Sequence, residues 1–444
     1  MKTFTLVLIT ILSATAAQAW QGRITDVGTN VGATVVKIAV PEFLPAAADA
    51  KTLALTDIFN KVLWDDLDFS GGVSLVGRSL YPLGKFSAPE DIKLEAWTTP
   101  AVDAQFLAFG SARVASGKIS VEARLWDLKS PQNREAIAKR YGNEDSEDGA
   151  RQIAHLFADD ILELIGGGVK GISQTKIAYV GERTVGVKEL YVMDYDGNGA
   201  GAMTAYKSQI MSPSWSPAGD KIAFSSFRRG SSDIDILGRV DRRPYTFDRA
   251  GGTTMTPSWA PDGSKIAFAT SRDGSYTQIY VADWNGKNMR RLTVSKSVDT
   301  SPVWNPRTGR EIAFISGRGG SPEIYIMDAE GTNVRRLIEE GGHMDEPAWS
   351  PDAQRIAFAW QRSRIANFDI YIYDFATGKY TQITHDAANN ERPTWAPDGR
   401  HLAFESTRMG SSQIFSMLLD GTKVRQLTNT GKNTAPAWSG YIKP

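Results

Sequence analysis

The chain has 444 residues, of which 50 are basic and 50 acidic, so its formal net charge is zero. A chain without net charge has no global field that would draw it to nucleic acid or to an anionic membrane, and neither partner is expected. Its hydrophobic content of 41% is ordinary for a globular protein, and the absence of cysteine excludes disulfides, thiol nucleophiles and thiolate metal sites.

Residues 1–19 have the pattern of a cleavable signal peptide. Lys2 supplies the basic start, residues 4–12 form a short apolar run, and residues 17–19 are Ala-Gln-Ala, a small-x-small cleavage site. The apolar run is too short to span a bilayer, and no later stretch approaches the ~18 apolar residues that a spanning helix needs. We therefore expect an exported protein that begins at Trp20 and is not inserted in a membrane.

Residues 20–33 contain three glycines and little periodicity, which predicts a mobile arm. Residues 34–165 predict a small α/β domain, because strand-like and helix-like patterns alternate there. Strands are expected at 34–41, 73–76, 106–114, 119–127 and 135–140, and helices at 51–66, 90–97 and 145–165. Glycines at 166–168 end the last helix and begin a linker to residue 172. This domain has no nucleotide-binding loop.

From residue 173 to the end, the sequence repeats. A Pro-x-Trp unit recurs every 43–46 residues and is followed, except at the last unit, by a turn and an apolar strand such as Ile-Ala-Phe. The six units are Pro213/Trp215, Pro257/Trp259, Pro302/Trp304, Pro347/Trp349, Pro393/Trp395 and Pro436/Trp438. Strand repeats with a period in the forties predict a β-propeller, in which each repeat is one blade of four strands, A to D.

The two ends of the repeat region are offset by one strand. The first B strand, at 176–180, has no Pro-x-Trp strand before it, and the last A strand, at 435–439, has no B strand after it. We expect the C-terminal strand to complete the first blade, which leaves no open edge at the seam. The predicted fold class is α+β/β: a small N-terminal α/β domain and a six-bladed propeller at 173–444, closed by its C-terminal strand.

The repeated tryptophans have two possible roles. Each indole can pack between neighbouring blades, where it buries about 150–250 Å², or can form part of an aromatic ligand cage. A residue that recurs at one position of every blade favours the core role.

Two further patterns suggest chemistry but are incomplete. Residues 194–199 match the first half of a calcium loop, but Ala205 stands where a bidentate glutamate is required. No Gly-x-Ser-x-Gly elbow accompanies the histidines, as serine hydrolysis would require. The histidines are His155, His343, His385 and His401. We therefore expect no enzyme activity, no catalytic residue, no metal and no cofactor.

An arginine lies four residues after the aromatic residue of each B strand: Arg183, Arg228, Arg272, Arg318, Arg362 and Arg408. In an antiparallel blade the B–C and D–A connections emerge on one face, so these arginines are expected on one face of the ring. The D–A connections add His343, Asp345, Glu346, His385 and Glu391. Each arginine can pair with a nearby carboxylate or carbonyl, or can anchor a partner protein, since arginine is enriched at binding hot spots.

Taken together, the signal peptide, the small α/β domain, the glycine linker and the Pro-x-Trp-x-Pro-Asp-Gly repeats resemble the TolB family, the periplasmic propeller proteins of the Tol–Pal system. The resemblance covers essentially the whole chain. It implies a monomeric periplasmic protein that binds the outer-membrane lipoprotein Pal through the mouth of the propeller channel, for which the loop residues above are the candidates. It also implies a role in outer-membrane integrity and in constriction at cell division.

The same resemblance implies that a TolA-like inner-membrane protein contacts the N-terminal arm. Carried over to this chain, the arm residues are Trp20, Gln21, Arg23, Ile24, Asp26 and Val27. The resemblance further implies that the order of the arm is coupled to Pal binding. We expect an ordered arm to pack at the domain junction and to disfavour the Pal-binding conformation, for which a coupling of about 1–3 kcal/mol would suffice.

Two other functions stay open at this point. The propeller could gate the catalytic domain of a peptidase-like hydrolase, although the N-terminal domain is small and lacks a nucleophile elbow. It could instead bind peptidoglycan or another carbohydrate, with Trp360 and Tyr276 as candidate stacking residues.

Overall fold

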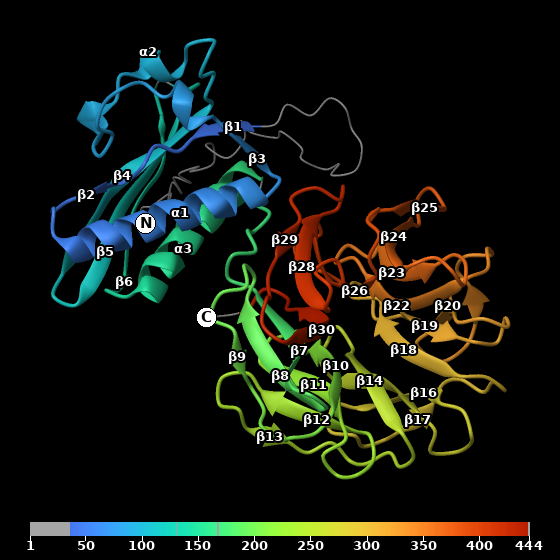
Figure 1. The fold of residues 1–444 in the computed structure, drawn as a ribbon. Helices are drawn as coiled ribbons and strands as arrows, with labels where there is room; N and C mark the ends of the chain where they lie inside the picture. Colours follow the sequence, from blue (N-terminus) through green and yellow to red (C-terminus); the bar gives the residue numbers. More distant parts are fainter. Residues whose placement is uncertain (1–35, 131, 167, 443–444) are drawn as a thin grey trace, which may run out of the picture.

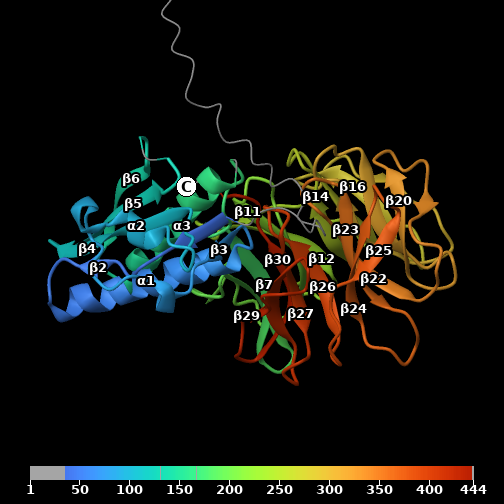
Figure 2. The ribbon, with the colours of Figure 1, turned by 90° about the horizontal axis from the view of Figure 1, so that it is seen from above.

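The structure is a computed structural model that describes residues 36–442, except 131 and 167. An N-terminal α/β domain and a propeller lie side by side (Figures 1 and 2). The predicted signal peptide and arm lie outside the described residues, so both stay predictions. Within the described part of the chain, no helix is both long and apolar enough to cross a membrane.

The N-terminal domain is a mixed sheet with two long helices against one of its faces (Figure 1). The strand order is β3-β1-β4-β5-β6, and β2 pairs with β4. The strands are β1 (Val36–Ala39), β2 (Leu44–Pro45), β3 (Val73–Leu75), β4 (Phe106–Ala115), β5 (Lys118–Asp127) and β6 (Glu135–Glu144). The helices are α1 (Ala50–Phe69), η1 (Arg78–Leu80), η2 (Pro89–Asp91), α2 (Leu94–Trp97) and α3 (Glu147–Ile165).

Both long helices begin at residues whose side chains cap them. Asp49 accepts a hydrogen bond from the Thr52 backbone N–H at 2.9 Å, and Ser146 accepts one from the Gly149 N–H at 3.1 Å. Their apolar faces meet the sheet in a core whose largest members include Phe59 and Phe157. This core fixes where the ends of α1 and α3 lie.

The expected short helix at 90–97 is instead two separate turns. Pro89 opens the 3₁₀ turn η2, and the backbone at Ile92 and Lys93 is extended before α2 begins. Proline is suited to the first position of a helix, but the extended residues that follow prevent one continuous helix. The single-helix prediction for this segment is therefore wrong.

The propeller of the described chain consists of six four-stranded antiparallel sheets, which we call blades I to VI. Blade I is β30 (Lys432–Trp438), β7 (Lys176–Thr184), β8 (Val187–Asp194) and β9 (Gly201–Ala202). Blade II is β10 (Ile210–Trp215), β11 (Lys221–Ser226), β12 (Asp233–Gly238) and β13 (Pro244–Tyr245). Blade III is β14 (Thr254–Trp259), β15 (Lys265–Thr270), β16 (Gln278–Asp283) and β17 (Arg290–Arg291).

The remaining blades follow the same order. Blade IV is β18 (Asp299–Trp304), β19 (Glu311–Ser316), β20 (Glu323–Asp328) and β21 (Arg335–Arg336). Blade V is β22 (His343–Trp349), β23 (Arg355–Gln361), β24 (Asp369–Asp374) and β25 (Lys379–Gln382). Blade VI is β26 (Asn390–Trp395), β27 (His401–Ser406), β28 (Gln413–Leu418) and β29 (Arg425–Gln426). The predicted six-bladed fold is confirmed.

The ring is closed by the C-terminal strand, as expected. β30 pairs antiparallel with β7, with Trp438 opposite Ile177 and Thr434 opposite Val180. The Trp438 indole donates to Thr175 Oγ1 at 2.8 Å. Strands from the two ends of the repeat region therefore complete blade I together.

The six tryptophans of the Pro-x-Trp units pack between blades, as predicted, and each is 6–8% exposed. The indoles of Trp215 and Trp395 donate to the carbonyls of Ala437 and Ala348 in the A strand of the preceding blade, both at 2.9 Å. The core clusters likewise span neighbouring blades; Trp304, for example, packs with Ile279 of blade III.

Ring closure by β30 can be tested by truncation. Deleting residues 432–444 should lower the melting temperature sharply, because it leaves β7 without its partner strand and removes Trp438. Replacing Trp438 alone by alanine should lower the free energy of unfolding by about 3–5 kcal/mol. Thermal unfolding followed by circular dichroism is the measurement. Trp284→Ala is the control, since that side chain is only partly buried on a C–D turn; an unchanged melting temperature after truncation would contradict this closure.

Candidate functional site

The A strands of all six blades surround a central cavity of about 620 Å³. The prolines of the six Pro-x-Trp units line it, and so do most of the tryptophans. A second set of prolines, from the A–B turns, lines the cavity at one end. We call the opposite end, where the D–A connections enter the A strands, the channel mouth.

A bulge in every A strand shapes this cavity. The pairing of A with B shifts register at the proline of each Pro-x-Trp unit and the residue before it. The residue before the proline has a positive φ of 50–56° in every blade. These six bulge residues are Ser212, Thr256, Ser301, Glu346, Arg392 and Ala435, and all of them line the cavity. Such a backbone is unfavourable for a residue with a side chain, by about 1–3 kcal/mol.

Neighbouring side chains satisfy backbone groups that the bulges expose. The Thr256 N–H donates to Ser225 Oγ of blade II at 3.0 Å, and the Ser301 N–H donates to Thr256 Oγ1 at 3.2 Å. The Ala435 N–H donates to Glu405 Oε2 of blade VI at 3.1 Å. These bonds link adjacent blades, so the bulges hold the ring together as well as lining the cavity.

Two of the bulge residues are charged and lie in adjacent blades. Arg392 Nε lies 2.6 Å from Glu346 Oε1 and 3.6 Å from Glu405 Oε2. Glu391 pairs directly across the strands with Glu405, and Asp345 accepts from the Glu346 N–H at 2.8 Å. This mouth cluster contains four carboxyl groups and one guanidinium, and the Lys432 ammonium acts on Glu391 from beside it.

Three carboxyl groups of the cluster have raised pKa values, chiefly because they are buried. Burial raises the pKa of Glu346 to about 8, against the opposing pull of Arg392. Burial also raises the pKa of Glu391, reinforced by the Glu405 carboxylate, and raises the pKa of Asp345. Carboxylates with raised pKa values are destabilised in their charged form, so a cation placed at the mouth would be favoured there.

Three of the five predicted D–A residues belong to the mouth cluster, and the two histidines do not. Asp345, Glu346 and Glu391 belong to the mouth cluster. His343 begins β22 and packs edge-on against Phe368 at 5.1 Å, while His385 is exposed on its connection.

The six B–C arginines lie over aromatic rings. The distances from guanidinium carbon to ring centroid are 4.7 Å for Arg183 on Tyr191, 4.5 Å for Arg228 on Tyr206, 5.9 Å for Arg272 on Tyr280, 5.1 Å for Arg318 on Tyr325, 4.8 Å for Arg362 on Trp360 and 4.8 Å for Arg408 on Phe415. Three of them also pair with nearby carboxylates at 2.7–2.9 Å, Arg228 with Asp235, Arg318 with Asp299 and Arg408 with Asp386. None of the six is among the residues that line the cavity. The described contacts are therefore intramolecular, and a direct role in partner binding stays a prediction.

Other candidates from the sequence occupy structural positions. Trp360 is 1% exposed and packs against Tyr371 and Tyr380, so its ring is not accessible to a carbohydrate. Tyr276 is 50% exposed, but the predicted pair of stacking residues is not formed. In the incomplete calcium loop, Asp194 pairs with Lys176 and Asp196 with Arg151.

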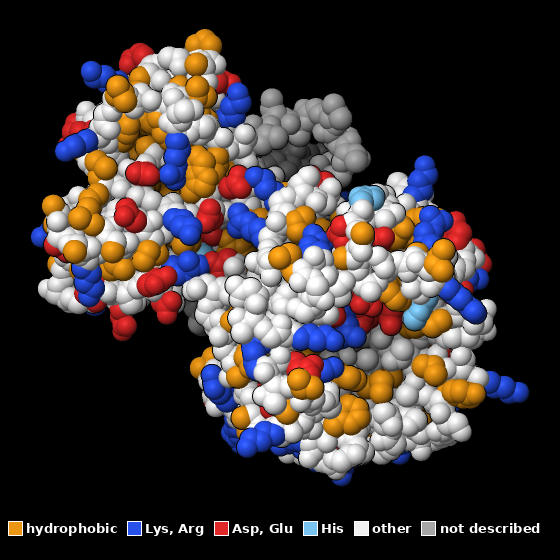
Figure 3. Space-filling view, viewed as in Figure 1, with side chains coloured by type: hydrophobic (Ala, Val, Ile, Leu, Met, Phe, Trp, Pro, Cys, Tyr) orange, Lys and Arg blue, Asp and Glu red, His pale blue; other side chains and the backbone are white. Residues whose placement is uncertain are grey.

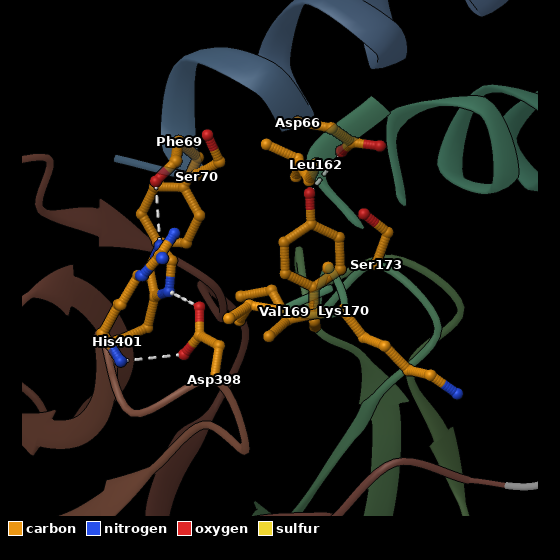
Figure 4. A pocket seen from close by; sticks show the side chains of 13 residues that line it. Asp66, Phe69, Ser70, Leu162, Val169, Lys170, Ser173, Asp398 and His401 are labelled. Carbon is orange, nitrogen blue, oxygen red and sulfur yellow. Dashed lines mark hydrogen bonds and ion pairs between the residues drawn. The ribbon is translucent and has the colours of Figure 1, made fainter. Parts of the chain in front are cut away.

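The domain interface is a second place where polar side chains gather (Figure 3). Here the C-terminal end of α1 lies against blades I and VI. Residues from the helix and from both blades line a small pocket at this contact (Figure 4). His401 donates from Nε2 to the Phe69 carbonyl at 2.8 Å, and the Tyr195 hydroxyl donates to Asp66. Lys423 of the C–D turn in blade VI pairs with Asp68 at 2.7 Å.

Sequence reasoning missed Arg392, Glu405 and the interface residues Asp66 and Tyr195. Arg392 had a detectable signal, because it occupies the same repeat position as Glu346, directly before the proline. The interface residues had none, since their contacts join segments that are more than 100 residues apart in the chain.

Fold and site together define a two-domain β-propeller protein with an open, acidic channel mouth. A family model described as the TolB beta propeller domain matches residues 164–346 and 339–442, and one described as the TolB amino-terminal domain matches residues 27–134. The chain therefore belongs to the TolB family.

Individual relatives agree with this assignment. The Tol-Pal system protein TolB of Bordetella pertussis is 34% identical over 307 residues, which cover 68% of this chain and 66% of the relative, just under two thirds of its length. The corresponding protein of a Ruegeria species is 34% identical over 308 residues, which cover 67% of this chain and 66% of the relative. The crystal structure of TolB from Acinetobacter baumannii matches with a TM-score of 0.77 at 24% identity, covers 92% of this chain and 97% of that structure, and supports the two-domain fold.

Arg392 should stabilise the mouth cluster in a pH-dependent way. Arg392→Ala leaves the four carboxylates without their cation and should lower the free energy of unfolding by about 1–3 kcal/mol. The difference from wild type should grow between about pH 5 and pH 8, because carboxylates with raised pKa values hold protons at the lower pH and lose them as it rises. Chemical denaturation across this range measures it.

Arg290→Ala is the matched control for this measurement. It removes an arginine from an exposed pair with Glu330, in which the side chains are 45% and 75% exposed. Such pairs contribute about 0–1 kcal/mol. If both variants lose the same small stability at every pH, the mouth cluster does not behave as described.

Proposed function

We propose that the protein is a non-catalytic, periplasmic interaction scaffold of a Tol–Pal system. In this proposal it binds a Pal-type outer-membrane lipoprotein at the channel mouth and a TolA-like inner-membrane protein through its N-terminal arm, and so supports outer-membrane integrity and invagination at division. Membership in the TolB family and the name of its relatives support the system. The single observation that supports the binding face is the acidic channel mouth with charged residues at the bulge positions.

The chemistry of the mouth indicates what would bind there. Four carboxyl groups face one guanidinium there, and three of them have raised pKa values, so a partner that inserts a lysine or arginine side chain would stabilise their charged forms. Arg392 already shows that a guanidinium fits between Glu346 and Glu405. A partner cation would occupy an equivalent position against Asp345 and Glu391.

Exposed apolar side chains lie on the same face as the mouth. They project from B–C and D–A connections, at Val185, Tyr276, Val294, Ile365 and Met409, and each is at least 50% exposed. A central polar site surrounded by apolar side chains can exclude water from the charged contacts when a protein partner covers the face. This arrangement supports a protein partner over a small polar ligand.

Two of the four histidines, His155 and His401, also support a scaffold rather than a hydrolase. His155 and His401 are buried at the domain interface, where each is hydrogen-bonded within the protein. Neither is placed beside an exposed hydroxyl nucleophile in the contacts described for it.

Binding at the mouth can be tested with charge-neutralising variants. The double variant Asp345→Asn/Glu391→Gln should weaken binding of the lipid-free domain of a Pal-type lipoprotein at least tenfold, or about 1.4 kcal/mol, because the partner loses its anionic contacts. Isothermal titration calorimetry is the measurement. Glu330→Gln, on a C–D turn of the opposite face, is the control; an affinity equal to wild type for the double variant would exclude the mouth.

The arm can be tested separately. Removing residues 20–33 should raise the affinity for the same partner by about 5–150-fold, because the ordered arm is proposed to disfavour the binding conformation. The truncated and full mature chains are compared by the same titration. Equal affinities would exclude the coupling and leave the mouth as an independent site.

A further inference from the structure

Two histidines bridge the domain interface, one from each domain. His155 lies in α3 of the N-terminal domain, and its Nδ1 is 2.7 Å from Asp66 Oδ2 of α1. Its Nε2 faces the propeller, 4.0 Å from Asp196 Oδ2 in the turn after β8. That nitrogen is buried and has no hydrogen-bond partner among residues 36–442 as the structure describes them.

His401 lies on the propeller side of the interface. Its Nδ1 contacts a carboxylate of its own domain, and its Nε2 contacts the other domain. Its Nδ1 is 2.7 Å from Asp398 Oδ2 in its own blade, and its Nε2 is 2.8 Å from the Phe69 carbonyl oxygen at the end of α1 (Figure 4). Its side chain is fully buried, and its ring lies 4.6 Å from the Phe69 ring.

His401 therefore has an oxygen within hydrogen-bond distance of both of its nitrogens, whereas His155 has one at Nδ1 and the Asp196 carboxylate at the longer distance of 4.0 Å from Nε2. A neutral imidazole has one N–H and one lone pair, so it can satisfy only one acceptor, whereas an imidazolium donates from both nitrogens. For His401, the neutral ring would leave a lone pair facing either a carboxylate or a carbonyl oxygen. For His155, it would leave the Nε2 lone pair facing the Asp196 carboxylate.

We infer that the two domains are held together by a pair of imidazolium ions, so that docking of the N-terminal domain on the propeller is proton-dependent. Loss of the second proton of His155 removes its ion pair with Asp196 across the interface. Loss of one from His401 places a nitrogen lone pair against either the Asp398 carboxylate or the Phe69 carbonyl oxygen. Docking is therefore tight at mildly acidic pH and loosens as the pH rises. This inference does not depend on the proposed function.

The charged groups around His155 are consistent with this sign. They are Asp66 on α1, Arg151 and Asp159 on α3, and Asp196 on blade I. Burial alone would lower the pKa of His155, but the Asp66 and Asp196 carboxylates outweigh it and raise this pKa above its usual value. A raised histidine pKa gives stability that is present below the unfolded value, about 6.5, and is lost as the pH rises through the folded value.

A neighbouring carboxyl group acts in the same direction. Burial raises the pKa of Asp159 to about 7, and this residue accepts a hydrogen bond from the Ser173 N–H at the start of the propeller. Its charged form is thus disfavoured inside the interface, and the resulting destabilisation grows as the pH rises from about 4 to 7.

Around His401 the charged groups are Asp398 and Arg400 on the A–B turn, with Tyr441 beside them and Arg425 on the far side of the Phe69 ring. Burial alone would raise the pKa of Asp398, but the charge and hydrogen bond of His401 hold it below its usual value. The anionic partner of His401 therefore persists on mild acidification.

The protonation states can be read directly, because the chain has only four histidines. Nitrogen-15 NMR of the histidine-labelled full mature chain should show both ring nitrogens of His155 and His401 protonated at mildly acidic pH, where docking is expected to be tight. His155→Gln and His401→Gln assign the signals. If both interface histidines are neutral at about pH 6, the inference is overturned.

The effect on docking needs a distance measurement. The chain has no cysteine, so Lys118→Cys in the N-terminal domain and Lys287→Cys in the propeller, both exposed, give a unique pair of spin-label sites. Wild type should give a narrow distance distribution at about pH 6 and a broader one at about pH 8. The double variant His155→Gln/His401→Gln should give the broad distribution at both pH values.

His385→Gln is the matched control and should behave as wild type, because it removes a histidine from an exposed connection far from the interface. A pH-independent wild-type distribution, or an unaltered pH response in the double variant, would overturn the inference. Should the double variant not fold, the NMR measurement on wild type still decides it.

Discussion

The left-handed residue before each Pro-x-Trp proline is the constraint on which the propeller depends. The proline that follows has no N–H, so the A strand cannot keep a regular ladder with B at this point, and the bulge absorbs the mismatch. Beyond it, the strand resumes in a register that directs the tryptophan to the neighbouring blade. The backbone strain recurs six times and is offset by the burial of six indoles and by hydrogen bonds between blades.

The same six positions also determine the chemistry of the channel. A bulge residue turns toward the cavity in every blade, so its identity can vary without a change in the fold. In blades I to IV these residues are small or hydroxylated, while in blades V and VI they are Glu346 and Arg392. Charge is thereby confined to one side of the mouth, where Glu391 and Glu405 join it. A repeated scaffold acquires an asymmetric site through substitutions at one repeat position.

The repeats made the propeller and its closure predictable, because Pro-x-Trp spacing reports directly on blade number and the unmatched strands at the two ends can pair only with each other. Five of the six arginines lie in the B–C connections and Arg183 lies near the end of β7, but the surroundings of all six depend on aromatic side chains elsewhere in the fold, such as Tyr191 and Tyr206. Periodicity could not reveal the contacts of Asp66, since they depend on how α1 lies against α3, for His155, and against blade I, for Tyr195. The arm lies outside the described residues, so its order rests on resemblance.

Blade VI connects the two places where polar groups gather. The hairpin of β26 and β27 has its A–B turn at the domain interface, where His401 contacts α1, and its opposite end at the mouth, where it supplies Glu391, Arg392 and Glu405. His401 and Glu405 lie on the same strand, four residues apart. A shift of the N-terminal domain that moved His401 would therefore act on a strand that also positions a mouth carboxylate. If the arm alters domain docking, this hairpin is the shortest path along the chain by which the change can reach the partner-binding face. Proton loss at the interface would act on the same strand.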